Sequence, residues 1–261
     1  MGWATGTRYL KEGALPHMWC PGCGNGIVLG ALLRAFEELG YENGDTVVVT
    51  GIGCWGKADD YLATCALHVT HGRALAFATG IKVYKPELNV VVLMGDGDGV
   101  TIGGNHFIHA ARRNIDLTAV IVNNFNYGMT GGQVSATTGA DRYTSTTPYG
   151  NPEREFDICA LAGAAGANYA ARETVFDGWQ LQQRMKEGLT RKGFALVEAV
   201  SPCPTHFGRY NQIDGPDLLR RLREVAGDGL VCGLLIDRNA PDFNARYREV
   251  QAWAQKRNDR N

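Results

Sequence analysis

Acidic and amide side chains stand directly after two predicted buried strands, where they could meet. Asp96 and Asp98 follow the apolar strand 90–94, and the pair Asn123–Asn124 follows the apolar strand 117–122. Because open α/β sheets bind ligands beyond the carboxyl ends of neighbouring strands, we expect these side chains to face one point. Their hard oxygens suit a divalent cation, and the interleaved glycines let the backbone approach a ligand closely. The pattern therefore indicates a metal–diphosphate site.

Thiols form the second group of residues that could do chemistry. Cys20 and Cys23 lie three positions apart in a Gly- and Pro-rich loop, and Cys54 and Cys203 each follow a predicted buried strand. Four thiolates in such loops suit an iron–sulfur cluster, and a structural zinc site of four cysteines fits the same spacing equally well. A thioredoxin-like redox pair is a third interpretation. The remaining cysteines are expected to be buried packing residues in apolar helical segments: Cys65, Cys159 and Cys232.

The dinucleotide-binding fingerprint Gly-x-Gly-x-x-Gly is matched letter by letter by residues 51–56, but without its context. That fingerprint needs a helix that begins at once and an acidic residue about 20 positions later. Here residues 57–60 read Lys-Ala-Asp-Asp, and the expected distance falls at His-Gly-Arg, residues 71–73. We therefore do not expect a nicotinamide site, and Cys54 is the informative residue of this loop.

Strands alternating with helices must position these residues, and this pattern predicts an α/β fold with a doubly wound parallel sheet. Strands are predicted at 46–50, 90–94, 117–122, 168–170 and 194–200. Helices are predicted at about 26–39, 71–84, 104–113, 153–163 and 175–191, with Gly40 ending the first. Residues 134–152 carry no hydrophobic period, and a loop of that length in a compact domain is usually functional.

Composition excludes several classes of protein. The 261 residues include 26 basic and 27 acidic side chains, so nothing favours nucleic acid or an anionic membrane as a partner. No apolar run has the length of a membrane span, and the first residues lack the pattern of a secretory signal. Seven cysteines, an odd number, suit thiolate ligands in a reducing compartment better than a disulfide framework. We therefore expect a cytoplasmic protein.

A family resemblance narrows these interpretations. Gly95-Asp96-Gly97, followed by Asn123-Asn124, resembles the thiamine diphosphate and magnesium motif of thiamine-dependent enzymes. A longer set of segments resembles the β subunit of 2-oxoacid:ferredoxin oxidoreductases, most closely the 2-oxoglutarate branch, over roughly residues 15–212. These segments are Gly95–Asp98, Ile102-Gly103-Gly104-Asn105-His106, Arg112-Arg113-Asn114 and Tyr127-Gly128-Met129-Thr130-Gly131-Gly132-Gln133.

The resemblance implies cofactors and site residues, although it assigns no catalytic residue. It implies a thiamine diphosphate-binding domain at 1–213 and a C-terminal helical extension at 214–261. Mg²⁺ would be held by Asp96, the Asn124 side chain and the Asn126 carbonyl. A 4Fe–4S cluster, rather than zinc, would be held by Cys20, Cys23, Cys54 and Cys203. Thiamine diphosphate would be lined by Ile52, Gly53, Cys54, Trp55, His71, Gly97, Asp98, Gly128 and Met129.

The implied activity is the oxidative decarboxylation of a 2-oxoacid with coenzyme A, electrons leaving through the cluster to ferredoxin. The favoured reaction converts 2-oxoglutarate to succinyl-CoA and CO2, with pyruvate, branched-chain or aryl 2-oxoacids as alternatives. Lys57 could meet a substrate carboxylate. The second domain that supplies a glutamate to the cofactor is not found, so an α subunit is the expected partner. More distant alternatives are a zinc-stabilised, non-catalytic thiamine-fold module and a non-redox thiamine decarboxylase.

Overall fold

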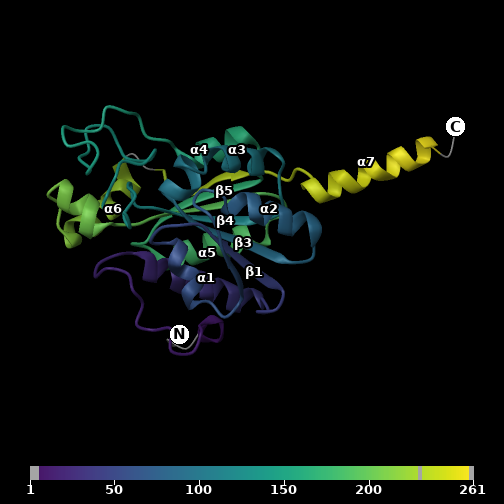
Figure 1. The fold of residues 1–261 in the computed structure, drawn as a ribbon, viewed down its shortest axis with the longest axis horizontal. Coiled ribbons are helices and arrows are strands. Elements are labelled where there is room, and N and C mark those ends of the chain that lie inside the picture. Colours follow the sequence, from purple (N-terminus) through teal and green to yellow (C-terminus); the bar gives the residue numbers. More distant parts are fainter. Residues whose placement is uncertain (1–5, 229–230, 259–261) are drawn as a thin grey trace.

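A seven-stranded sheet organises the chain in the computed structural model, which describes residues 6–228 and 231–258 (Figure 1). The strand order is β2-β1-β3-β4-β6-β5-β7, and only β7 runs antiparallel to its neighbour. The strands are β1 (Thr46–Thr50), β2 (Cys65–His68), β3 (Asn89–Gly95), β4 (Thr118–Asn123), β5 (Tyr169–Thr174), β6 (Ala195–Val200) and β7 (Gly233–Asp237).

Helices cover both faces of the sheet, which confirms the predicted doubly wound α/β fold (Figure 1). One face carries α1 (Asn25–Leu39) and α5 (Gly178–Thr190); the other carries α2 (Ala74–Tyr84), α3 (Gly104–Arg112) and α4 (Ile158–Ala165). Near the end of the chain lie α6 (Gly215–Asp228) and α7 (Phe243–Asn258), and α7 projects away from the body. Among the described residues, no helix has both the length and the apolar character to cross a membrane.

The central strands are buried on both faces, which explains their continuous apolar sequences. In β3, Val91 and Leu93 pack into the core under α1 and α5, whereas Val92 and Met94 pack into the core under α2 and α3. Successive side chains of a strand point to opposite faces, so one run of apolar residues serves both cores.

The start of one helix and the structure of the C-terminal segment differ from the sequence-based expectations. The helix expected at 153–163 begins only at Ile158, because the Asp157 side chain accepts a hydrogen bond from the Ala160 amide and caps α4 there. The segment 214–261 is not wholly helical, since β7 joins the sheet beside β5. The segment after residue 213 therefore contributes a strand to the sheet and is not a purely helical extension.

Of the three cysteines expected to be buried in helices, only Cys159 meets that expectation, in α4. The prediction is wrong for Cys65, which is exposed on the edge strand β2. Cys232 is half-buried and precedes β7 rather than lying in a helix. The short apolar segment around Cys65 could not be distinguished from a helix by periodicity alone.

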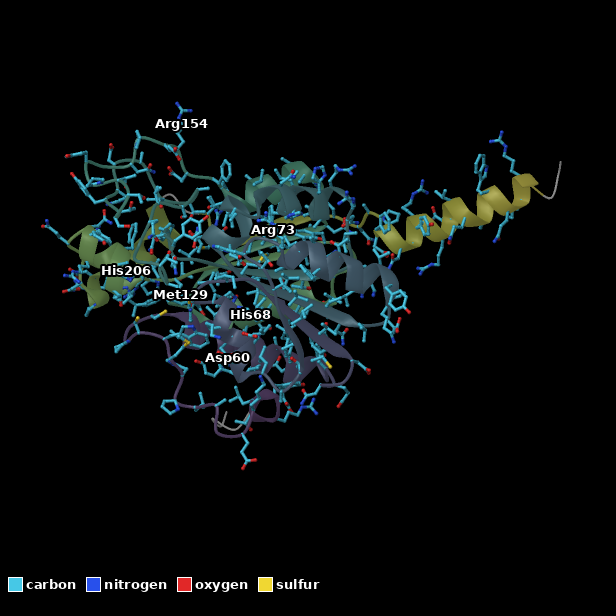
Figure 2. All side chains as sticks on the ribbon, in the orientation of Figure 1. Asp60, His68, Arg73, Met129, Arg154 and His206 are labelled. Atoms are coloured by element: carbon cyan, nitrogen blue, oxygen red, sulfur yellow. The ribbon has the colours of Figure 1, made fainter. Side chains whose placement is uncertain are left out.

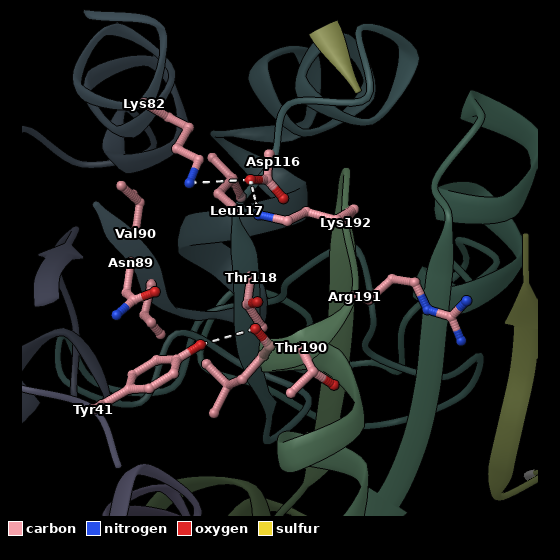
Figure 3. A pocket seen from close by; sticks show the side chains of 12 residues that line it. Tyr41, Lys82, Asn89, Val90, Asp116, Leu117, Thr118, Thr190, Arg191 and Lys192 are labelled. Atoms are coloured by element: carbon pink, nitrogen blue, oxygen red, sulfur yellow. Dashed lines mark hydrogen bonds and ion pairs between the residues drawn. The ribbon is translucent and has the colours of Figure 1, made fainter. Parts of the chain in front are cut away.

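The amino ends of β3 and β4 carry a small polar cavity of about 50 Å³ (Figure 3). There Asp116 Oδ2 lies 3.0 Å from Lys82 Nζ and 3.2 Å from Lys192 Nζ. The buried Lys82 ammonium also donates to the Leu88 carbonyl at 2.7 Å. A liquid water occupies about 30 Å³, so this cavity has room for little besides solvent, and its carboxylate already pairs with both lysines. We regard it as structural.

A buried ion pair connects the neighbouring strands β5 and β6. Arg172 Nε on β5 lies 2.8 Å from Glu198 Oε2 on β6, and Glu198 Oε1 accepts a hydrogen bond from the Asn123 side chain at 2.9 Å. Arg172 Nη2 also lies 2.5 Å from Asp157 Oδ1. Since unpaired buried charges are costly, this chain of contacts fixes the end of β4 relative to β5 and β6.

Asp157→Asn is expected to lower stability by about 1 kcal/mol or less at neutral pH, because the Arg172–Asp157 pair is half exposed. Burial raises the pKa of Asp157, but hydrogen bonds from the Ala160 amide and Arg172 outweigh it and lower the pKa below 3.8. Such a carboxyl stabilises the fold above its unfolded pKa, and this contribution is lost as pH falls through the folded value. The difference in Tm between wild type and variant should therefore shrink on acidification below pH 3.8; an equal difference at every pH would contradict the assignment.

Candidate cofactor and metal site

A pocket opens beyond the carboxyl ends of β1, β3 and β4, where the sheet order places these strands side by side. The register pairs Gly95 of β3 with Val122 of β4, so Asp96 and Asn123–Asn124 leave the sheet at the same level. The pocket wall contains all the residues predicted to line a cofactor: Ile52, Gly53, Cys54, Trp55, His71, Gly97, Asp98, Gly128 and Met129.

The Asn124 carboxamide faces two oxygens in this pocket. One of its terminal atoms lies 3.2 Å from Asp96 Oδ1 and 2.7 Å from the Asn126 carbonyl oxygen. With nitrogen in that place, Asn124 donates to both; with oxygen there, three oxygens converge on one point. Neighbouring oxygens around an octahedral Mg²⁺ are about 3 Å apart, since each lies about 2.1 Å from the ion. The donor set and its spacing therefore fit Mg²⁺.

Asp96 is almost completely buried, and burial raises the pKa of its carboxyl while hydrogen bonds from two hydroxyls oppose that shift. Its Oδ2 accepts from Ser135 Oγ and from Thr137 Oγ1, both at 2.6 Å. These two hydroxyls were not anticipated as individual residues, although the absence of a hydrophobic period over 134–152 marked their loop. A buried carboxylate needs such donors or a cation, and here both can be present.

Hydrogen bonds to Asp98 connect three segments of the pocket wall. Its Oδ1 accepts from His71 Nδ1 at 2.5 Å, from the Gly72 amide at 2.7 Å and from the Ile52 amide at 3.3 Å. Its buried Oδ2 has no hydrogen-bond partner among the described residues. A Cβ at Gly51 would lie 2.0 Å from that oxygen, so only glycine fits there. Asp98 therefore fixes the loop after β1 and the orientation of the His71 ring.

The four loop cysteines line one cavity of about 200 Å³ beside this pocket: Cys20, Cys23, Cys54 and Cys203. A Cβ placed on Gly128 would lie 3.5 Å from Cys54 Sγ and 3.6 Å from Cys203 Sγ. Burial, with a smaller contribution from the neighbouring cysteines, raises the pKa of Cys23 to about 11 and of Cys54 to about 12. Neutral thiols are thus favoured until a cationic group enters the cavity.

The arrangement of these thiols bears on the open choice between zinc and a cluster. Within residues 6–228 and 231–258, no three His, Cys, Asp or Glu side chains approach closely enough to hold a single metal ion. Four sulfurs around one zinc ion would lie about 3.8 Å apart, given Zn–S bonds of about 2.3 Å. A cavity of about 200 Å³ lined by four thiols also has room for a larger group such as a 4Fe–4S cluster.

The pocket and the cysteine cavity share a wall formed by Cys54, Asn124, Gly128 and Met129. Figure 2 shows Met129 and His206 at this end of the sheet, and both line the cysteine cavity. The Cys54 loop is anchored by Trp19 Nε1, which donates to the Cys54 carbonyl at 2.6 Å. Single π-helical turns, a feature frequent at functional sites, follow Asp96 at Gly97–Thr101 and Cys203 at Pro204–Gly208.

Lys57 has no place in either wall; its Nζ lies 2.7 Å from Asp60 Oδ2, and its substrate role stays a prediction. The segment Gly56–Tyr61 is a 3₁₀-helix rather than the α-helix that a dinucleotide fingerprint requires. This agrees with the expectation that the glycines of residues 51–56 do not form a nicotinamide site.

Fold and pocket together define a thiamine pyrophosphate enzyme. Residues 42–199 match the family model described as "Thiamine pyrophosphate enzyme, C-terminal TPP binding domain". A solved 2-oxoglutarate:ferredoxin oxidoreductase from Magnetococcus marinus, with 2-oxoglutarate, coenzyme A and succinyl-CoA bound, superposes with a TM-score of 0.84 at 32% identity. The superposition covers 98% of this chain and 92% of the other.

Curated relatives narrow the class. The 2-oxoglutarate synthase subunit KorB of Archaeoglobus fulgidus is 56% identical over 83% of this chain and 79% of its own length. Its namesake in Methanocaldococcus jannaschii is 51% identical over 83% and 81%. The 2-oxoacid:ferredoxin oxidoreductase subunit beta of Saccharolobus solfataricus is 42% identical over 72% and 62%. The chain belongs to the β subunits of the 2-oxoacid:ferredoxin oxidoreductases, which confirms the resemblance seen in the sequence.

Proposed function

We propose that this chain is the β subunit of an enzyme that converts 2-oxoglutarate and coenzyme A to succinyl-CoA and CO2 and passes the electrons to ferredoxin. The observation that carries the proposal is the shared wall of Cys54, Asn124, Gly128 and Met129. It puts a site suited to decarboxylation next to a site suited to electron transfer. Neither a non-redox decarboxylase nor a zinc-stabilised module has a use for that adjacency.

The residues of the first pocket would hold thiamine diphosphate through Mg²⁺, with Asp96, the Asn124 side chain and the Asn126 carbonyl as protein ligands. The thiols of Cys20, Cys23, Cys54 and Cys203 would hold a 4Fe–4S cluster. When bound, the thiamine cofactor supplies the chemistry that removes CO2 from a 2-oxoacid, and the cluster takes up electrons singly.

The chain's own side chains orient and enclose this site. The His71 Nδ1–Asp98 Oδ1 contact of 2.5 Å leaves Nε2 as the free ring nitrogen. The Tyr127 ring stands edge-on to His71 with centroids 5.7 Å apart, and its hydroxyl donates to the Gly97 carbonyl at 3.0 Å. These contacts hold the His71 ring in one orientation, which is what a group that positions a bound ligand requires.

The substrate assignment is supported by relatives named 2-oxoglutarate synthase and by the solved enzyme with 2-oxoglutarate bound. The test is anaerobic turnover of the co-expressed α and β chains on 2-oxoglutarate, pyruvate, branched-chain and aryl 2-oxoacids, with coenzyme A and ferredoxin or a viologen dye. We expect the highest kcat/KM with 2-oxoglutarate and no turnover by the β chain alone. Preference for another 2-oxoacid would reassign the substrate, whereas turnover without dye reduction would contradict the electron-transfer proposal.

The surface beside the pocket is suited to bind an α subunit. Helix α2 begins directly after His71-Gly72-Arg73, and it exposes an uncharged stripe on its outer side: Ala76, Phe77, Gly80, Val83 and Tyr84. A Cβ at Gly80 would meet nothing within 4 Å, so a partner backbone could approach closely. Because the stripe continues from the pocket rim at His71, a subunit completing the cofactor site would cover it. The relatives are themselves named as subunits.

Phe77→Asp is expected to weaken the αβ complex by about 30-fold or more, because a charge at the centre of an apolar interface costs at least about 2 kcal/mol. Gel filtration of the co-expressed pair across a dilution series measures the effect. Trp179→Asp, at an exposed aromatic residue of α5 on the other face of the sheet, is the matched control. If Trp179→Asp separated the subunits and Phe77→Asp did not, the partner would bind the face of the sheet that carries α5, and the proposed interface at α2 would be wrong.

A further inference from the structure

The loop between β4 and α4 reaches back into the magnesium pocket with its buried end. Ser135, Thr137 and Thr138 are each almost fully buried, although residues 134–157 contain no helix or strand. The turn that they form is closed on itself, since the Thr138 amide donates to the Ser135 carbonyl at 3.0 Å and the Ser135 amide to Thr138 Oγ1 at 2.9 Å. This turn, Ser135–Thr138, therefore has a defined shape without belonging to any regular element.

Contacts to both neighbouring segments fix the position of the Ser135–Thr138 turn. Thr138 Oγ1 donates to the Phe125 carbonyl at 2.7 Å, inside the Asn124–Asn126 segment. The Ala136 amide donates to Thr101 Oγ1 at 2.9 Å, in the segment after Asp96. The turn thus joins the two strand ends whose oxygens face each other in the pocket.

The two oxygens of Asp96 have different surroundings because of this turn. Oδ2 accepts hydrogen bonds of 2.6 Å from both Ser135 and Thr137, whereas Oδ1 faces the Asn124 carboxamide at 3.2 Å. Two short hydrogen bonds to one oxygen fix the rotation of the carboxylate about its Cβ–Cγ bond. They also leave the lone pairs of Oδ1 free to bind a cation.

We propose that Ser135 and Thr137 are positioning residues of the magnesium site, an inference that rests on the proposed function. By holding Oδ2, their hydroxyls present Oδ1 of Asp96 to Mg²⁺ at the spacing set by Asn124 and Asn126. Groups that orient a metal ligand in this way commonly contribute about 10- to 100-fold to metal affinity. The loop would therefore determine how tightly the diphosphate is held, although neither Ser135 nor Thr137 lines the pocket.

A purely structural role would make a different prediction, because hydroxyls that only satisfy a buried carboxylate would affect stability and not Mg²⁺ affinity. The experiment uses the intact αβ enzyme and follows thiamine diphosphate binding as Mg²⁺ is titrated, through the tryptophan fluorescence of the pocket residue Trp55 or by calorimetry. We expect the apparent Kd for Mg²⁺ to rise about 10- to 100-fold in Thr137→Val and in Ser135→Ala. Thr137→Ser, which keeps the hydroxyl, should bind as wild type does.

Thr144→Val is the matched control, since Thr144 is a buried threonine of the same loop whose hydroxyl contacts Thr147 at 2.7 Å instead of Asp96. Wild-type affinity in Thr137→Val and Ser135→Ala, or equal weakening in Thr144→Val, overturns the inference and leaves the proposed function intact. Absence of Mg²⁺-dependent binding by the wild-type enzyme overturns both. The two single variants are tested separately, and near-UV circular dichroism confirms that each is folded before titration.

Discussion

Cys54→Ser is expected to reduce the iron content of the anaerobically purified αβ enzyme from about four atoms per β chain to less than about one. Cys54 lies in the wall between the cysteine cavity and the cofactor pocket, and its sulfur and that of Cys203 flank Gly128. A serine hydroxyl ionises far less readily than a thiol and ligates iron poorly. Reduction of viologen by 2-oxoglutarate should be lost together with the iron, and iron analysis with electron paramagnetic resonance measures the change.

Cys65→Ser provides the matched cysteine control, because Cys65 is exposed on the edge strand β2 and lines neither cavity. It should retain the full iron content and activity. Zinc in place of iron in the wild-type enzyme would support the zinc-stabilised alternative instead. Unchanged iron in Cys54→Ser would remove this residue from the ligand set.

Asp96→Asn is expected to weaken Mg²⁺-dependent binding of thiamine diphosphate by about 100-fold or more, since loss of a direct ligand should exceed the loss of a group that orients one. The fold should survive, because the amide oxygen can still accept hydrogen bonds from Ser135 and Thr137. In the absence of Mg²⁺ the Tm should stay equal or rise, since a neutral amide avoids the cost of burying a charge. Calorimetric titration and thermal unfolding measure the two quantities independently.

Asp116→Asn should show the opposite pattern. Asp116 is a carboxylate at the amino ends of the strands, where it pairs with the buried Lys82. Its loss should lower the Tm by leaving that ammonium uncompensated while thiamine diphosphate binds normally. If Asp96→Asn lowered the Tm and left Mg²⁺ affinity unchanged, Asp96 would be a structural residue and the metal site proposed here would be wrong.

The apolar pattern of the strands predicted the central sheet for a physical reason, whereas the residues expected to line the cofactor came from the family resemblance. Buried parallel strands need continuous apolar residues, and their carboxyl ends share one end of the sheet, so the sequence alone predicts that Asp96 and Asn124 lie close together. The edge strands were harder to predict from the sequence. β2 is exposed and β7 is only partly buried, so neither has the continuous apolar sequence that indicates a buried strand.

Side-chain partnerships outside regular elements could not be predicted in the same way. Helix α3 and strand β4 lie between Asp96 and these two residues, Ser135 and Thr137, in the chain. Nothing in a Ser- and Thr-rich loop indicates which of its hydroxyls will be buried. Lys57 is the converse case, since its cationic side chain made it a candidate for the substrate carboxylate. In the structure Lys57 pairs with Asp60 through an i,i+3 contact of 2.7 Å, and its substrate role stays a prediction.

The sequence by itself determined the chemistry of this protein: oxygen donors at the ends of β3 and β4, four thiols in Gly- and Pro-rich loops, and a motif that marks the family. These follow from residue type and from the geometry of consecutive strands, which are local properties. Only the tertiary structure decided that the pocket and the cysteine cavity share the wall of Cys54, Asn124, Gly128 and Met129, and which oxygen of Asp96 faces Asn124. Both depend on where irregular loops settle, and loop positions are set by long-range packing and hydrogen bonds that leave no period in the chain.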